Sequence, residues 1–214
     1  MSFEKLRYIA IEGVIGAGKT TLANMLCETL QAELVLEEFE QNPFLEEFYN
    51  DPVRFSFQTQ IFFLLSRFRQ QENLRQLDLF RKQIVSDYMF EKDRIFATLN
   101  LSDKEMKLYD GIARLMEREI PVPDLVIYLQ ASTNHLMDNI QKRGRSYEKN
   151  MAQDYIAELN ELYNSFFLRY NKTPLLIINT DELDFLNENR DYEDILREIR
   201  HHPTGTRYFV SKKK

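Results

Sequence analysis

A glycine-rich segment near the start of the sequence carries its clearest chemical signal. Residues 13–20 read GVIGAGKT and satisfy the pattern GxxxxGK(S/T), whose glycines let backbone N–H groups turn towards phosphate oxygens. In this pattern Lys19 reaches the outer phosphates and Thr20 offers a hydroxyl to Mg²⁺. Because Thr21 stands where a dinucleotide-binding GxGxxG loop would need glycine, we expect a nucleoside triphosphate such as ATP instead. The residues predicted to bind ATP here are Gly13, Val14, Ile15, Gly16, Ala17, Gly18, Lys19, Thr20 and Thr21.

Two further groups of residues could act on the bound phosphates. The run QIVSD ends in Asp87, and an acid at the end of a buried strand is typical of the residue that holds the Mg²⁺ shell. The cationic run KRGR at 142–145 resembles a lid, because Arg143 and Arg145 on a mobile segment could close over phosphates and exclude water. Two plainer readings stay open: an ordinary strand-terminal acid, and a solvated helix end whose cations complement the dipole.

A carboxylate also lies where an acceptor hydroxyl would need to lose its proton. Glu37 and Glu38 follow a short apolar run, and the ligands of open α/β sheets bind beyond the carboxyl ends of the strands. Either carboxylate could accept the proton, although each alone could equally be a surface charge. The residues together favour transfer of a phosphoryl group from ATP to a hydroxyl group.

The elements expected to position these residues alternate along the chain. Continuous apolar runs are typical of parallel strands covered on both faces, and helix-period segments separate them. Asp-Pro at 51–52 indicates the start of one helix, and the capping-box spacing at 102–105 indicates another. We therefore predict a three-layer α/β fold in which helices cover a five-stranded parallel sheet. The predicted strands contain residues 8–11, 34–36, 84–85, 125–129 and 175–178.

Length and composition bound the organisation of the chain. The 214 residues, 43% of them hydrophobic, suit a single domain over 1–214, with a lid at about 141–150 and an unplaced tail at about 201–214. The single cysteine, Cys27, fits a reducing compartment, and the opening 1–13 lacks a signal-peptide pattern. Since no run of about 18 apolar residues occurs, we expect a cytoplasmic protein without a membrane partner. A net charge of −6 argues against a nucleic-acid partner.

Side chains suited to a small-molecule pocket share one face of the helix expected after 51–52. Gln60 and Arg67 are seven residues apart, and Ser56 and Phe63 join them on that face. An amide and a guanidinium among phenylalanines suit a pocket for a flat heterocyclic base. A core helix with two snorkelling polar side chains is the alternative.

Several separated segments carry motifs that occur together in one known family. The segments are 11–20, 37, 42–45, 48–49, 54–60, 67, 87–97, 142–145 and 184–185. In this order they resemble the deoxynucleoside kinases of the deoxycytidine, deoxyguanosine and deoxyadenosine group, most of all the bacterial purine kinases. The resemblance covers nearly the whole chain. It implies a phosphotransferase of nucleotide salvage, a homodimer that uses ATP and Mg²⁺ to phosphorylate the 5′-hydroxyl of a deoxynucleoside, with a purine favoured over thymidine.

The resemblance also implies roles for residues around the nucleoside. It makes Glu37 the general base for the 5′-hydroxyl, places Tyr49 and Glu148 at the 3′-hydroxyl of the sugar, and stacks Phe96 on the base. Asp87 is expected to lie against the acceptor as well as Mg²⁺. The residues expected to read the base edge are Gln60, Arg67 and Asp93.

On the phosphate side, the resemblance assigns Arg143 and Arg145 to the lid, where they act in catalysis together with Lys19. It places Asp184 and Phe185 in the loop beside the adenine of ATP. Predicted metal ligands are Thr20 and Asp87.

The end of the third predicted strand departs from the family pattern. Most members have an acid, an arginine and a serine there, whereas this chain has Asp87, Tyr88 and Met89. The missing arginine would help to position the acceptor and the phosphates. We therefore expect Lys19 and the lid to supply its charge.

Two other functions remain as alternatives. A nucleoside monophosphate kinase such as thymidylate kinase shares the phosphate loop and the lid, but it must bind an anionic acceptor, and a carboxylate such as Glu37 would repel the acceptor's phosphate. A non-catalytic module that only binds ATP is the second alternative, because a fold does not fix a function. The altered residues at 87–89 keep this second alternative open.

Overall fold

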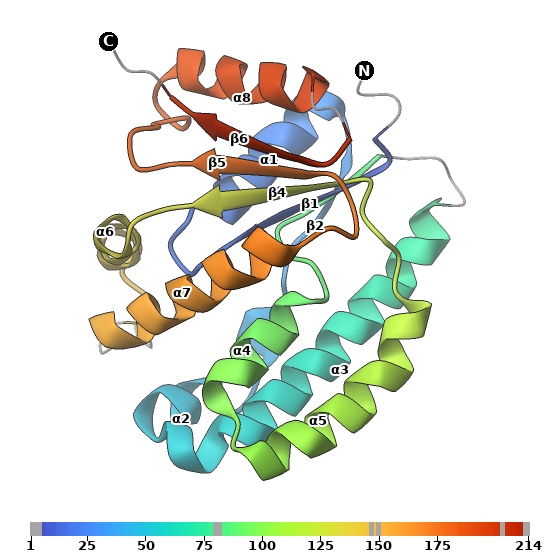
Figure 1. Cartoon of the computed structure of the whole chain (residues 1–214), viewed down its shortest axis with the longest axis vertical. Helices are drawn as coiled ribbons and strands as arrows, with labels where there is room; N and C mark the ends of the chain where they lie inside the picture. Colours follow the sequence, from blue (N-terminus) through green and yellow to red (C-terminus); the bar gives the residue numbers. More distant parts are fainter. Residues whose placement is uncertain (1–5, 79–82, 146–147, 149–150, 202–203, 212–214) are drawn as a thin grey trace.

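The architecture is a six-stranded parallel sheet flanked by helices (Figure 1). The computed structural model describes residues 6–78, 83–145, 148, 151–201 and 204–211. The strand order is β2-β3-β1-β4-β5-β6, and every neighbouring pair is parallel. The strands are β1 (Tyr8–Gly13), β2 (Glu33–Val35), β3 (Ile84–Ser86), β4 (Leu125–Gln130), β5 (Leu175–Asn179) and β6 (Thr206–Val210).

The sheet contains one strand more than the sequence predicted. All five predicted runs form strands, and β6 comes from the tail at about 201–214 that the sequence patterns left unplaced. β6 pairs with β5 from Leu175↔Thr206 to Asn179↔Val210. Its residues alternate between exposed and half-buried, as expected for an edge strand, and its short apolar run, 208–210, is only partly covered.

Helices lie on both sides of the sheet. In Figure 1, α8 lies above the strands, α7 crosses in front of them, and α2, α3, α4 and α5 form a group below. Among the described residues, no helix is long and apolar enough to cross a membrane. The helices are α1 (Lys19–Leu30), α2 (Leu45–Asn50), α3 (Pro52–Asp78), α4 (Lys92–Asn100), α5 (Asp103–Met116), α6 (Thr133–Arg143), α7 (Gln153–Arg169) and α8 (Asn189–His201), with short 3₁₀ turns at η2 (Phe39–Gln41) and η3 (Glu117–Glu119).

Local signals in the sequence set where two of these helices begin. α3 begins at Pro52, and the Asp51 carboxylate accepts a hydrogen bond from the backbone N–H of Arg54 at 3.3 Å. α5 follows Ser102, whose backbone N–H donates to Oε2 of Glu105 at 2.9 Å in the predicted capping box. Both predicted starts are confirmed. From its start, α3 runs alongside α4 and α5.

The central strands form the core that holds the site in place. Every residue of β1 is buried, and β4 is buried along all but its last residue. On the α7 side, Tyr128 of β4 stacks on Phe167 with ring centroids 4.2 Å apart. Because the strands are parallel, their carboxyl ends, and the loops that follow β1, β2 and β3, meet at one edge of the sheet.

Candidate active site

The glycine-rich loop at 13–20 connects the end of β1 to the first turn of α1. Gly16 and Gly18 have φ angles of +88° and +90°, which side-chain-bearing residues rarely adopt. A Cβ on Gly16 would also lie 2.6 Å from the carbonyl oxygen of Leu136. Because side chains are excluded here, a phosphate can approach the backbone at the N-terminus of α1.

Lys19 lies across this loop, partly buried. Its Nζ donates a hydrogen bond to the carbonyl oxygen of Val14 at 3.0 Å. Burial, and then the positive charge of Lys92, lower the pKa of Lys19 to about 8. Lys19 is therefore mostly protonated at neutral pH, and phosphate anions beside it would stabilise the charged form further.

Thr20 and Asp87 bring two oxygen ligands together beside the loop. The Thr20 hydroxyl donates to Oδ2 of Asp87 at 2.6 Å, and Oδ1 of Asp87 accepts the backbone N–H of Glu37 at 2.8 Å. No group of three or more His, Cys, Asp or Glu that could hold a metal ion exists among the described residues. Mg²⁺ with a nucleotide usually needs only one or two protein oxygens in addition to phosphates and water. The Thr20–Asp87 pair therefore fits the predicted Mg²⁺ site.

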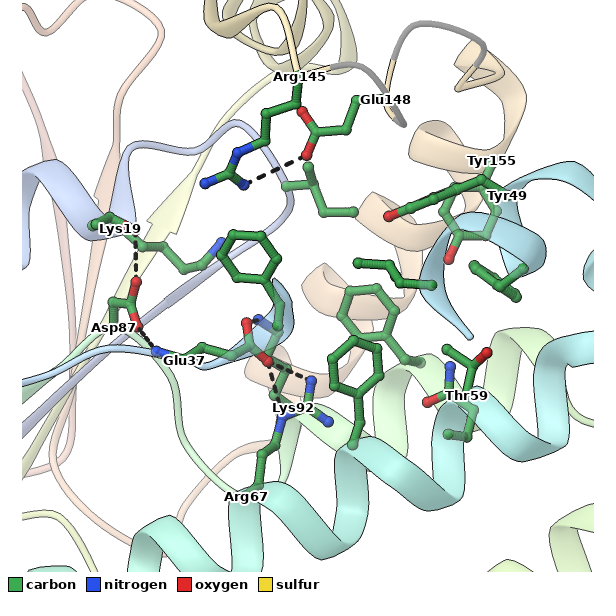
Figure 2. A pocket seen from close by; sticks show the side chains of 18 of the residues that line it. Lys19, Glu37, Tyr49, Thr59, Arg67, Asp87, Lys92, Arg145, Glu148 and Tyr155 are labelled. Atoms are coloured by element: carbon green, nitrogen blue, oxygen red, sulfur yellow. Dashed lines mark hydrogen bonds and ion pairs between the residues drawn. The ribbon is translucent and has the colours of Figure 1, made fainter. Parts of the chain in front are cut away.

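The second half of the site is a buried network of charges around Glu37. Arg67 of α3 donates through Nε and Nη2 to Oε1 of Glu37, at 2.9 and 2.5 Å. Lys92, the first residue of α4, forms an ion pair with Oε2. Arg67 also forms an ion pair with Asp93 through Nη1, so that one guanidinium joins two carboxylates. Figure 2 shows Glu37 between these cations and the Lys19–Asp87 side of the site.

This network keeps Glu37 ionised. Burial alone would raise the pKa of the Glu37 carboxyl, but the charges of Lys92 and Arg67 and their hydrogen bonds outweigh burial and hold the pKa well below its usual range. The carboxylate is therefore ready to accept a hydrogen bond from a hydroxyl. It also binds its proton weakly, so its orientation matters more than its basicity.

A pocket walled by apolar and aromatic side chains opens beside Glu37. Figure 2 shows Tyr49 and Tyr155 on the far side of this pocket from Lys19. Two acceptor atoms, Oε1 of Gln60 and Oδ2 of Asp93, are buried without a hydrogen-bond partner among the described residues. Buried polar atoms usually have partners, so Oε1 of Gln60, which lines the pocket, indicates where a ligand with N–H donors would bind, while Asp93 adjoins the lining through Arg67. The apolar and aromatic lining consists of Ile15, Phe39, Leu45, Phe48, Tyr49, Phe63, Phe96 and Tyr155.

The described part of the predicted lid faces the same pocket. Arg143 ends α6 and donates to both carboxylate oxygens of Glu148, at 3.1 and 2.6 Å. Arg145 lies 3.6 Å from Oε1 of Glu148, and its guanidinium lies 4.3 Å from the centre of the Phe39 ring. The structure therefore brings both lid arginines together with the residue expected at the sugar. The lid residues 146, 147, 149 and 150 lie outside the described part of the chain.

Two of the predicted residues lie outside the pocket around Glu37, one of them against the phosphate loop. The Phe185 ring reaches to 3.1 Å from where a Cβ of Gly18 would lie, so it packs over the loop. Asp184 accepts hydrogen bonds from the backbone and side chain of Asn187. The two residues do not line the pocket around Glu37. The remaining predicted site residues outside the loop all line it, except Asp93, which contacts it through Arg67.

Several residues that the fold places here had no role in the sequence analysis, among them Lys92, Glu12, Phe39 and Tyr155. Phe39 and Tyr155 come from a 3₁₀ turn and from α7, and no local pattern distinguishes them from other aromatic residues. One signal could have pointed to Lys92: it is a cation close in sequence to position 88, where the family's arginine is missing, and lies five residues after Asp87.

Glu12 forms hydrogen bonds with both the phosphate loop and the segment after β3. Its Oε1 accepts a hydrogen bond from the backbone N–H of Met89 at 2.7 Å. Its Oε2 accepts one from the backbone N–H of Gly13 at 3.1 Å and one from the Tyr163 hydroxyl at 3.3 Å. Burial raises the pKa of this carboxyl, while the charges of Lys92 and Lys19 act in the opposite direction. A buried acid thus connects the end of β1 to the segment that follows β3.

Comparisons with known proteins agree with this geometry. The profile of a family described as deoxynucleoside kinase matches residues 9–203. Deoxyguanosine kinase from Bacillus subtilis is 35% identical over 198 residues, which cover 90% of this chain and 96% of that protein. Deoxyadenosine/deoxycytidine kinase from the same organism is 32% identical over 199 residues, covering 89% and 90%. The structure of deoxyadenosine kinase from M. mycoides with bound dATP superposes with a TM-score of 0.79 at 29% identity, covering 90% of this chain and 98% of that one. This chain belongs to the deoxynucleoside kinase family.

Proposed function

We propose that this protein transfers the γ-phosphoryl group of ATP to the 5′-hydroxyl of a deoxynucleoside, with a purine preferred. One observation carries the choice of acceptor: the ionised carboxylate of Glu37 lies between the phosphate loop and the aromatic pocket, and Arg67 and Lys92 are both paired with it. A carboxylate in this place suits a neutral hydroxyl. It would repel the phosphate of a nucleoside monophosphate, which makes a monophosphate kinase the weaker reading.

Unpaired acceptors in the pocket and next to it support a base with an amino group. Oε1 of Gln60 and Oδ2 of Asp93 both need a donor. Adenine, cytosine and guanine each have an exocyclic amino group, whereas thymine has a single ring N–H between two carbonyl groups. Relatives named for deoxyguanosine and deoxyadenosine support a purine among these three bases.

The residues around the reacting atoms then have separate tasks. The O–H bond of the 5′-hydroxyl breaks and its proton moves to Glu37. The freed oxygen bonds to the γ-phosphorus, while the bond from that phosphorus to the bridging oxygen breaks and ADP leaves. Lys19, Arg143 and Arg145 stabilise the charge on the transferred group, and the aromatic pocket excludes water from competing as acceptor. Because such transition states are loose, orientation of the hydroxyl by a weakly basic carboxylate is sufficient.

Thr20 and Asp87 are the residues that would hold Mg²⁺ in this scheme. When bound with ATP, the ion neutralises charge on the β- and γ-phosphates. The side chain of Asp87 also fixes the start of the Glu37 segment through the backbone N–H of that residue. Placement of the metal side and of the acceptor side is thereby coupled through one carboxylate.

Three expectations from the sequence belong to this proposal as predictions. They are a single domain over 1–214, a homodimer and a cytoplasmic location. The first two are checked by limited proteolysis and by light scattering of the eluting protein, which distinguishes a mass near 26 kDa from one near twice that value. Tagged protein in fractionated cells checks the third.

ADP release from ATP and Mg²⁺ tests the function directly, with dA, dG, dC, dT and dGMP each supplied separately. We expect turnover with dA or dG, less with dC and least with dT, and strongly reduced turnover with every nucleoside in protein carrying Lys19→Ala. Turnover with dGMP alone would identify a monophosphate kinase. ATP binding without any acceptor-dependent ADP release would identify a non-catalytic module.

A further inference from the structure

Lys92 is a buried cation that the scheme above does not yet use. It is the first residue of α4, its Nζ forms an ion pair with Oε2 of Glu37, and it lies 5.7 Å from the centre of the Phe96 ring. Its side chain is 6% exposed, so the ammonium group is removed from water and depends on Glu37 for compensation.

Among the described residues, the cations expected to replace the charge missing at Tyr88 make other contacts and are not paired with Glu37. Tyr88 itself is fully buried, and burial raises the pKa of its hydroxyl, so the side chain is neutral. Nζ of Lys19 donates to the Val14 carbonyl, and both lid arginines face Glu148. Among the described residues, the cations paired with Glu37 are Arg67 and Lys92.

The two cations divide the carboxylate between them. Arg67 binds Oε1 with a fork of two N–H groups and is itself anchored to Asp93. Lys92 approaches the other oxygen with a single ammonium group. A carboxylate oxygen can accept two hydrogen bonds, so Oε2 can take a substrate hydroxyl without breaking the Arg67 fork. α3 and α4 thus each hold one oxygen of the Glu37 carboxylate.

Resting on the proposed 5′-phosphorylation, we infer that Lys92 is a positioning residue that holds Oε2 of Glu37 against the acceptor hydroxyl and supplies the positive charge that the chain lacks at Tyr88. Lys19 and the lid were expected to supply this charge; in the inference it comes instead from the first turn of α4, five residues after Asp87.

Kinetics of Lys92→Met, which removes the charge and keeps an unbranched chain, test the inference. We expect kcat to fall about 100-fold, the size expected when one charge-assisted hydrogen bond is lost, while the KM for ATP and the Kd for the nucleoside stay within about threefold. Lys92→Arg should recover kcat to within about tenfold of wild type, because it restores a cation. Arg94→Met is the matched control: Arg94 lies two residues further on in α4, on the surface, paired with Asp110, and its removal should leave kcat unchanged.

The outcomes separate this inference from the proposed function. A wild-type protein that is silent with every nucleoside overturns both. Active wild type together with unchanged kcat in Lys92→Met, or with a loss confined to KM and nucleoside Kd, overturns the role of Lys92 alone. Should Lys92→Met fail to fold, Lys92→Gln carries the same test, since it retains a donor without the charge. Wild-type kcat in that variant overturns the inference.

Discussion

The two halves of the active site are built in different ways. The phosphate half is made mainly of backbone from one continuous segment, 13–20, whose left-handed glycines expose N–H groups at the start of α1. The acceptor half is made of side chains from separate elements, with Arg67 on α3 and Lys92 on α4 meeting Glu37 after β2. A backbone cradle recognises phosphate whatever the acceptor is, whereas a side-chain pocket can be tuned to one base.

This difference leads to a testable separation of effects. Substitutions in the phosphate half should lower kcat by the same factor with every acceptor, because every acceptor receives the same phosphoryl group. Substitutions among the base-reading residues should instead change the ranking of acceptors. Glu37 lies at the boundary, and Glu12 joins the two halves without facing either substrate.

The largest effect should follow Lys19→Ala. Because Lys19 supplies positive charge beside the transferred phosphoryl group, we expect kcat to fall about 1,000-fold, and by the same factor for dA, dG and dC. ADP release with each nucleoside measures this, with Lys172→Ala, an exposed lysine paired with Glu91, as the unaffected control. Unequal losses among the three nucleosides would contradict the separation of the two halves.

Glu37→Gln should cost about 100-fold or more in kcat, since the amide cannot accept the proton of the hydroxyl. It also leaves Lys92 and one side of Arg67 without a counter-charge, so a lower melting temperature is expected alongside. Glu38→Gln, at the exposed neighbouring position, is the matched control. A near wild-type rate for Glu37→Gln at neutral pH would remove Glu37 from the role of base.

A smaller and more selective effect is expected from Gln60→Leu. The change removes a buried hydrogen-bonding group facing the pocket, so the ratios of kcat/KM among dA, dG and dC should shift by about tenfold. The KM for ATP should stay the same. Gln58→Leu, on the exposed side of the same helix, should alter neither quantity. Equal losses for all nucleosides would show that Gln60 does not read the base.

The smallest effect should appear in stability rather than in rate. Because burial raises the pKa of Glu12 in the folded protein, the folded state binds more protons than the unfolded chain above the carboxyl's ordinary pKa. The stability that Glu12 contributes is therefore full at low pH and is lost as pH rises through the raised folded pKa. Glu12→Gln cannot ionise, so its stability relative to wild type should rise across that window.

Urea denaturation from pH 4.5 to 8 measures this difference between wild type and Glu12→Gln. Glu28→Gln, at an exposed position on α1, serves as the control for removing an acid. Parallel pH profiles of stability for wild type and Glu12→Gln would show that the pKa of Glu12 is not raised in the folded protein.

The sequence predicted five strands of the sheet, including β2 at one edge, and missed β6 at the other edge. The five continuous apolar runs became strands, and the helix starts at Pro52 and Ser102 follow their local signals. β6 was not predicted, although 208–210 is a short apolar run; the run is only partly covered, because this edge strand pairs with β5 on one side only. In the site, the order of strand, loop and helix around 13–20 could be predicted, because this order depends only on residues adjacent in sequence.

The sequence by itself determined the phosphate loop, the α/β architecture and the types of side chain available for chemistry, because short-range patterns of glycine, apolar residues and caps encode them. Only the tertiary structure decided which charges meet. Lys92 faces Glu37 rather than solvent because α4 packs beside α3, and the lid arginines are paired with Glu148. Contacts between residues 30 and 55 positions apart depend on the packing of whole elements, and no local pattern records that packing.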